Sequence, residues 1–232
     1  EGVKGLSLFL VPKFLPAADG TPGVRNDVRC VSIEHKLGIR GSPTAVLALG
    51  DGDGAIGYLV GSENRGLDLM FVMMNHARMA VGLEGVGIAD RAYQEARAYA
   101  LDRVQGRKLG SPDPQAAAIA WHPDVQRMLL SMKATSEGAR ALTYFTAAAV
   151  DRAERHPDAD IRARQQRLVG LLTPVVKAWC TDVGIEVADT GIQVHGGTGY
   201  IEESGVPQFV RDARIAPIYE GTNGIQALDL VG

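Results

Sequence analysis

The sequence predicts an α+β fold that is mainly α, with part of an antiparallel β-domain over residues 1–65 and an antiparallel helical bundle of the four-helix type over residues 66–232. Short apolar runs separated by glycine and proline fill the first part, which is typical of strands joined by turns. After residue 65, apolar residues recur at steps of three and four, as in helices with one buried face. With 232 residues, 46% of them hydrophobic, the chain is long enough to bury a core.

Three strands are expected in the first part, over residues 6–11, 28–33 and 44–49. Pro12 ends the first strand because proline cannot donate to a ladder. Residues 19–23 and 50–54 are rich in glycine and aspartate and are expected to form loops.

The first long helix is expected from residue 66 to about residues 106–110. Gly82, Gly85 and Gly87 interrupt it, and each costs roughly 1 kcal/mol relative to alanine in a helix interior. We therefore expect another part of the fold to approach these glycines closely. The apolar face of this helix is predicted to contain Met70, Met74, Ala77, Val81, Ile88, Ala92, Ala96 and Tyr99.

Three further helices are expected. The second covers residues 123–153 and is ended by Pro157; the third runs from about residue 160 to about residue 190, with a kink or restart at Pro174. A short fourth helix is expected over residues 225–231. The buried side of the second helix is predicted to contain Val125, Met128, Leu129, Met132, Leu142 and Phe145.

The composition argues against several classes of protein. The net charge is −3, from 24 basic and 27 acidic residues without a long basic run, so nucleic acid is not an expected partner. Cys30 and Cys180 lack metal-type spacing and are expected to be free thiols in a reducing cytosol. No metal site, membrane span or secretion signal is expected. Both ends are interpreted as cuts through a larger protein.

The segment 215–226 contains one carboxylate, Glu220, among residues that favour a turn. Such a carboxylate can face a cavity, where withdrawal from water favours the neutral acid and suits the group to accept a proton near neutral pH. The alternative is that Glu220 is a surface acid before a helix that Thr222 caps. Both interpretations stay open from this segment alone.

The glycine-rich segment 193–200 follows the third helix, and its N–H groups can bind a phosphate-bearing ligand. Tight turns after helices also need glycine, and His195, which has no partner at metal-ligand spacing, is expected to be structural. Arg103 and Arg107 lie near the end of the first helix, where the dipole favours cations whatever the function; they also suit a pyrophosphate. Arg78, close to an apolar helix face, needs an anionic partner.

Taken together, these segments resemble the acyl-CoA dehydrogenase family over almost the whole chain. The segments that carry the resemblance are residues 36–44 of the β-domain, the helix 66–106, the loop 193–200 and the turn 218–226. Residues 122–129 and the long second helix are most similar to the large broad-specificity fatty-acyl and methylthiopropanoyl-CoA types.

The resemblance implies a FAD-dependent oxidoreductase that converts acyl-CoA thioesters to trans-2-enoyl-CoA. Glu220 matches the base that removes the α-proton, while the β-hydrogen leaves as hydride to the flavin, and the backbone N–H of Glu220 matches a donor to the thioester carbonyl. Arg78, Met74 and Tyr219 match substrate-binding positions. Further residues match positions that bind FAD, and most of these match contacts to the FAD of a neighbouring subunit. They are Arg103, Gln105, Gln193, Gly196, Gly197 and Thr222.

The same resemblance implies a homodimer or homotetramer and an electron-transfer flavoprotein or similar acceptor. It also implies that an N-terminal helical domain and the first β-domain stretch are missing here, so the isolated chain is expected to bind FAD poorly and to be inactive. Gly106 and Gly224 depart from the residues common in the family. The alternatives are an acyl-CoA oxidase, a non-catalytic relative that binds nucleic acid in stress protection, and a helical interaction module without chemistry.

Overall fold

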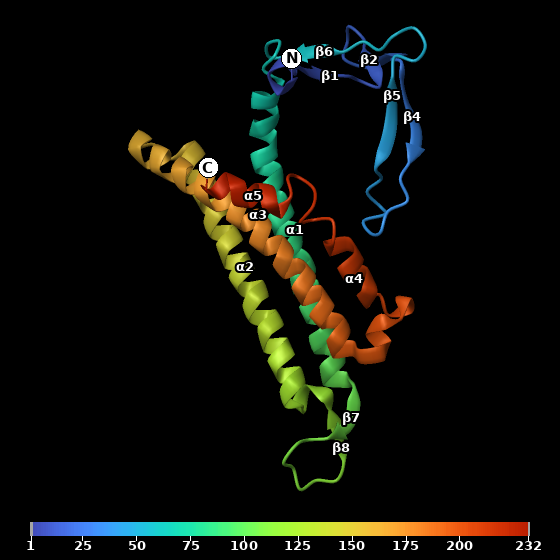
Figure 1. Ribbon diagram of the computed structural model, residues 1–232, viewed down its shortest axis with the longest axis vertical. Coiled ribbons are helices and arrows are strands. Elements are labelled where there is room, and N and C mark those ends of the chain that lie inside the picture. Colours follow the sequence, from blue (N-terminus) through green and yellow to red (C-terminus); the bar gives the residue numbers. More distant parts are fainter. Residues whose placement is uncertain (1, 232) are drawn as a thin grey trace. The chain divides into compact units, whose positions relative to one another are not determined.

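The computed structural model describes residues 2–231, and the chain forms two compact units that divide between Asn75 and His76. The long helix α1 (Gly66–Asp102) begins at the predicted residue and belongs to both units. The predicted domain boundary after residue 65 coincides with the start of α1 and precedes the division between the units. The mainly helical α+β architecture is confirmed (Figure 1).

The first unit consists of short antiparallel strand pairs. β1 pairs with β6, β2 with β3, and β4 with β5. Its elements are η1 (Gly2–Gly5), β1 (Leu8–Leu10), β2 (Phe14–Pro16), β3 (Pro22–Arg25), β4 (Val28–Ile33), β5 (Ala45–Leu49) and β6 (Tyr58–Val60). The three predicted strands are therefore confirmed as β1, β4 and β5, and each of their ends lies within two residues of its predicted position. The strands β2, β3 and β6 were not predicted, because three or four residues are too few to show a period of two.

Asn26 holds the loops of the first unit together. Its side chain is buried and donates to the carbonyls of Pro12 and Ile56 at 2.9 and 2.8 Å, while its Oδ1 accepts from the Ile56 N–H at 2.9 Å. Next to it, Asp27 accepts from the Gly52 N–H at 2.7 Å. Buried backbone groups in loops need such partners, so these two side chains replace a ladder where the strands are short.

The second unit is built on three long helices, the part of α1 from His76 onward, α2 (Pro123–Arg155) and α3 (Ala159–His195), of which α2 runs antiparallel to α1 and α3 (Figure 1). Buried small and branched side chains fill the space between them, as in a helical bundle. The core residues are Val86, Ala89, Ala92, Ala96, Ala100, Met128, Met132, Ala139, Val176, Cys180, Val183, Val187, Ala188 and Val194.

Glycines let α1 and α3 approach closely. A Cβ on Gly85 would lie 2.2 Å from the Cys180 carbonyl oxygen, and one on Gly82 would lie 2.6 Å from Val176 Cγ1. On α3, a Cβ on Gly184 would lie 3.0 Å from the Cα of Gly85. The predicted close approach is therefore confirmed at Gly82 and Gly85. It is wrong for Gly87, where a Cβ would meet nothing within 4 Å.

The predicted buried side of α2 is wrong at Phe145, which is 56% exposed. Thr143 and Thr146 are buried instead, and their hydroxyls donate to the carbonyls of Ala139 and Leu142 at 2.9 and 2.8 Å. A threonine that bonds back to the preceding turn has no unsatisfied polar group, so it can occupy a core position.

The third helix is longer than predicted. α3 continues through Pro174 without a break and ends at His195, past the predicted end near residue 190. Pro174 and its neighbours Thr173 and Val176 are buried. Packing along this face outweighs the one backbone hydrogen bond that proline removes, which explains why the helix continues.

Several short elements complete the second unit. A hairpin of β7 (Val104–Arg107) and β8 (Ala116–Ala118) follows α1, so that helix ends earlier than predicted. The helix α4 was not predicted, whereas α5 confirms the predicted short fourth helix and begins two residues earlier. The remaining bounds are η2 (Ile119–Trp121), η3 (Gly196–Tyr200), η4 (Glu202–Ser204), α4 (Val206–Ala213) and α5 (Asn223–Val231).

Within residues 2–231, one helical stretch, Ala159–Tyr200, is long and apolar enough to cross a membrane by length and composition alone. It contains α3, the central helix of the bundle core, and 44% of its most apolar window is buried inside the structure. Cys30 and Cys180 are free, as predicted, and Cys180 is buried.

Replacing Asp158 with alanine is expected to lower the free energy of unfolding by about 1 kcal/mol, because its carboxylate caps α3. It accepts from the N–H groups of Asp160 and Ile161 at 2.8 and 3.4 Å. Thermal unfolding measures this effect. Asp189→Ala, which removes an exposed aspartate inside the same helix, should leave the melting temperature nearly unchanged. Equal effects of the two substitutions would contradict the capping role.

Candidate functional site

Glu220 lies on the turn between α4 and α5, with a backbone φ of +56°. Left-handed backbone costs a non-glycine residue roughly 1–2 kcal/mol, so the surrounding contacts must hold it. Gly221 follows with φ of +83°, which glycine adopts readily. Glu220 itself is half-buried.

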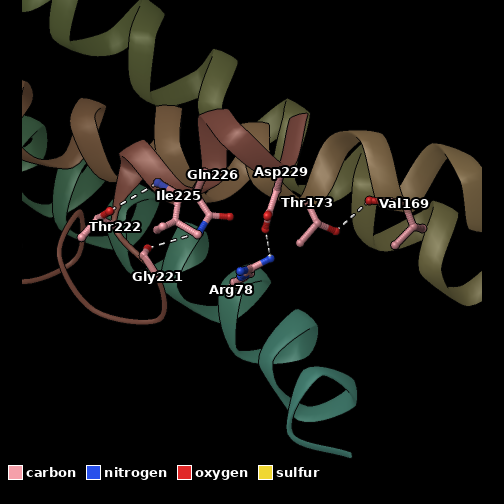
Figure 2. A network of polar contacts seen from close by, with 8 residues as sticks. All are labelled: Arg78, Val169, Thr173, Gly221, Thr222, Ile225, Gln226 and Asp229. Carbon is pink, nitrogen blue, oxygen red and sulfur yellow. Dashed lines mark hydrogen bonds and ion pairs between the residues drawn. The ribbon is translucent and has the colours of Figure 1, made fainter. Parts of the chain in front are cut away.

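Backbone hydrogen bonds close this turn on both sides. The Tyr219 N–H donates to the Ile215 carbonyl at 3.1 Å, and the Asn223 N–H donates to the Pro217 carbonyl at 3.1 Å. Thr222 Oγ1 accepts from the Ile225 N–H at 3.3 Å, so Thr222 caps α5 as predicted (Figure 2). Among the described residues, the Glu220 N–H has no backbone partner.

Arg78 lies on α1 beside this turn and is 6% exposed. Its Nη1 pairs with Asp229 Oδ2 of α5 at 2.7 Å, so the predicted anionic partner is Asp229 (Figure 2). The turn also packs on this arginine, because a Cβ on Gly221 would lie 3.5 Å from Arg78 Nη2 and 2.9 Å from Gln226 Nε2. Within the described part of the chain, Arg78 Nε and Gln226 Oε1 are buried without a hydrogen-bond partner. The two side chains therefore present buried polar atoms beside the turn.

Tyr219 anchors the other side of the turn to α1. Its hydroxyl donates to Glu84 Oε2. Burial raises the pKa of Tyr219, and the hydrogen bond to Glu84 raises it further, so the phenol stays protonated at neutral pH. Glu84 was not predicted as a site residue.

Lys177 and Asn223 were also not predicted as site residues. Lys177 of α3 is completely buried, and its Nζ donates to Asn223 Oδ1 at 3.0 Å. Desolvation by burial lowers the pKa of Lys177, against the opposing attraction of Asp182 and Glu220. The signal was visible in the sequence: Lys177 is a single charge in the apolar run 171–180, as Arg78 is on α1.

A second group of predicted residues lies at the far end of the bundle, where α1 and α3 end. The rings of Tyr99 and His195 stack there with centroids 4.3 Å apart, and the Tyr99 hydroxyl donates to Thr198 Oγ1 at 3.5 Å. These contacts join the end of α1 to the end of α3 and the segment Gly196–Tyr200; Arg103 directly follows α1, and Gln105 lies on β7. The Gln105 carbonyl bonds to His122 Nε2 at 2.8 Å.

The glycine-rich segment is helical in the structure, and the predicted loop is wrong. Gln193 and His195 form the last turn of α3, and Gly196–Tyr200 forms the 3-10 helix η3. His195 is buried, with Nδ1 2.7 Å from the Gly191 carbonyl oxygen, which confirms its structural role. Gln193, Gly196 and Gly197 are exposed.

The structure thus gathers the predicted residues of the second unit into two groups. Arg78, Tyr219, Glu220 and Thr222 surround the turn before α5, whereas Arg103, Gln105, Gln193, Gly196 and Gly197 lie at the ends of α1 and α3 (Figure 1). Most of α1 separates Arg78 from Arg103, about 37 Å at 1.5 Å per residue. The two groups therefore cannot face one reacting bond. Met74 is half-buried on α1 in the first unit.

Comparisons with known proteins identify the family. Residues 64–231 match the model described as acyl-CoA dehydrogenase, C-terminal domain. Over its whole length, the chain is 55% identical to the 3-methylmercaptopropionyl-CoA dehydrogenase of Ruegeria pomeroyi, and the alignment covers 39% of that protein. It therefore spans well under half the length of this relative.

Solved structures give the same result. The Caenorhabditis elegans protein ACDH-11 in complex with C11-CoA aligns with a TM-score of 0.84 and 30% identity over 100% of this chain and 36% of that one. An acyl-CoA dehydrogenase from Bacillus anthracis complexed with FAD aligns with a TM-score of 0.75 and 28% identity over 88% of this chain and 34% of that one. The fold, the matched domain and these relatives together show that the chain belongs to the acyl-CoA dehydrogenase family.

Proposed function

We propose that the full-length protein is a FAD-dependent acyl-CoA dehydrogenase that converts acyl-CoA thioesters to trans-2-enoyl-CoA, with Glu220 as the base. The observation that carries this proposal is the turn before α5. It holds a half-buried carboxylate in a left-handed backbone conformation beside the buried Arg78, within the matched family domain. Strained backbone at a carboxylate is typical of functional sites.

Members of this family bind FAD, as the Bacillus anthracis complex does. The residues at the ends of α1 and α3 suit such a group. A Cβ on Gly196 or Gly197 would meet nothing within 4 Å, so a flat ligand can approach this backbone. Arg103 is exposed, and among the described residues its side chain has no ion-pair partner, which leaves it for a pyrophosphate.

We assign Arg103, Gln105, Gln193, Gly196 and Gly197 to a FAD held by a neighbouring subunit, and Thr222 to the FAD of its own subunit. The separation of the two groups within one chain supports this division. A bound FAD would supply the acceptor for the substrate's β-hydrogen, which leaves as hydride.

The chain's own residues supply the acid–base part of the reaction. The Glu220 carboxylate accepts the α-proton of the acyl group, which places negative charge on the thioester carbonyl oxygen. The Glu220 N–H, which has no backbone partner within residues 2–231, donates to that oxygen. Tyr219 remains protonated and keeps the turn on α1 through Glu84, and Arg78 contributes to the acyl-CoA pocket. Met74, which lies in the first unit, stays a predicted substrate contact.

The proposed assembly is a homodimer or homotetramer, because FAD contacts from a second copy complete the site. An electron-transfer flavoprotein or a similar acceptor reoxidises the flavin, and the protein acts in the cytoplasm. The net charge of −3 does not favour nucleic acid as a partner.

Product analysis of the full-length protein tests this function. The purified flavoprotein is incubated with a panel of acyl-CoA thioesters of different chain length, methylthiopropanoyl-CoA included, and an artificial electron acceptor. We expect at least one thioester to lose two hydrogens and form a trans-2-enoyl-CoA, as mass spectrometry measures. Stoichiometric peroxide under oxygen without the acceptor would instead identify an oxidase. Recovery of every thioester unchanged would contradict the proposal.

A further inference from the structure

A buried lysine lies behind the turn that carries Glu220. Lys177 is 0% exposed on α3, and among the described residues its ammonium group has one hydrogen-bond acceptor, Asn223 Oδ1 at 3.0 Å. Lysine is rarely fully buried unless it is paired, and its closest hydrogen-bond partner here is a neutral amide. Stability alone therefore does not explain why a cation stands at this position.

Asn223 connects this lysine to the turn. Its Nδ2 lies within hydrogen-bonding distance of the Ala178 carbonyl at 3.2 Å, Thr181 Oγ1 at 3.3 Å and Asp182 Oδ1 at 2.8 Å. Every side-chain polar atom of Asn223 is thus bound to one turn of α3. Because Asn223 is also the first residue of α5, these contacts fix the start of that helix relative to the bundle.

The same residue closes the turn around Glu220. The Asn223 N–H donates to the Pro217 carbonyl at 3.1 Å, so Glu220 lies inside a short loop whose end is bound to α3. The left-handed conformation of Glu220 persists only if the surroundings determine it strongly. Asn223 and Lys177 provide this constraint from α3, in addition to the contacts that Arg78 and Glu84 make with the turn from α1.

Charged groups on three neighbouring segments interact with Lys177. They are Asp182 on α3, Arg78 on α1 and Glu220 on the turn. The two carboxylates attract the lysine, and the arginine repels it.

We propose that Lys177 and Asn223 are positioning residues for the base: Asn223 fixes the turn that carries Glu220, and the buried Lys177 holds the Asn223 side chain in place. This inference rests on the proposed dehydrogenase function. It adds two residues, on α3 and α5, that need not touch the substrate.

Steady-state kinetics of full-length Lys177→Met and Asn223→Asp test this inference. Met keeps the length of lysine without its charge, and Asp keeps an acceptor for Lys177 but loses the donors to α3. Both are expected to lower kcat by about 10–100-fold with little change in KM, because small displacements of a reacting group have effects of this size.

Three controls separate the possible outcomes. Lys177→Arg keeps a donor for Asn223 Oδ1, so it should retain part of the kcat that Lys177→Met loses. Thr146→Ala removes another buried hydrogen bond, on α2 to the Leu142 carbonyl, and should lower the melting temperature without changing kcat. Flavin content, read from the absorption spectrum, shows which variants are folded.

The inference is overturned if folded Lys177→Met has the wild-type kcat, or if Asn223→Asp behaves like Thr146→Ala. If Lys177→Met does not fold, Asn223→Asp alone decides. The wild-type protein in the same assay separates failure of the proposed function from failure of this inference. If the wild type forms no enoyl-CoA, the proposed function is rejected. If the wild type is active and the variants are unaffected, only this inference is rejected.

Discussion

Replacing Glu220 with glutamine in the full-length protein is expected to lower kcat by about 10²–10⁴-fold, the range that a general base contributes. Glutamine has the same shape as glutamate but no basic oxygen, so the substrate binds and the α-proton stays in place. KM should change little, because the interaction that is lost belongs to the transition state. The backbone conformation at φ of +56° is no harder for glutamine, so folding should be preserved.

Dehydrogenation of the best thioester with an artificial electron acceptor measures this effect, with flavin content as the check of folding. Glu203→Gln is the matched control, because Glu203 is an exposed acid in η4 away from the turn. It should leave kcat unchanged. A Glu220→Gln enzyme with undiminished turnover would remove the base from the mechanism and favour the helical interaction module.

The long helices could be predicted because their signal extends over many turns. Apolar residues at steps of three and four placed the start of α1 at Gly66 and the start of α2 at Pro123 without error. Even in a long helix, single residues can be assigned to the wrong face. Phe145 followed the apolar pattern, yet Thr143 and Thr146 occupy the core, because hydrogen bonding to the preceding turn is not visible in hydropathy.

Tertiary packing decided the features that were missed. Pro174 carries a strong local signal for a break, but buried contacts on both sides continue α3 past it. The hairpin of β7 and β8 has strands of four and three residues, too short for a periodic pattern. At Pro174 the competing influence acts between segments far apart in the sequence, where local propensity carries no information.

The candidate site divides in the same way. Glu220, Arg78 and Thr222 stand out in the sequence because a lone acid, a lone base and a cap occupy distinctive local positions. Asn223 is an ordinary turn residue by sequence, and only the fold reveals that its amide joins α5 to α3. Lys177 was visible as an isolated charge in an apolar helix, but its partner lies 46 residues away.

Replacing Gly85 with alanine is expected to lower the free energy of unfolding by about 3 kcal/mol, the upper end of the usual cost of overpacking. The new methyl group would lie 2.2 Å from the Cys180 carbonyl oxygen, which is backbone and cannot move away like a side-chain end. α1 and α3 must therefore separate along the face that also contains Gly82 and Gly184. The gain in helix propensity, about 1 kcal/mol, offsets only part of this cost.

Gly87→Ala on the same helix is the matched comparison. Gly87 is exposed, and a Cβ there would meet nothing within 4 Å, so alanine should stabilise the protein by about 0.5–1 kcal/mol through helix propensity alone. Thermal unfolding of both full-length variants should therefore show shifts of opposite sign. Because α3 carries Lys177 on the same packed segment, Gly85→Ala should also lower kcat, while Gly87→Ala should not. Shifts of the same sign for the two substitutions would mean that the helices do not meet at Gly85 as closely as the structure has them.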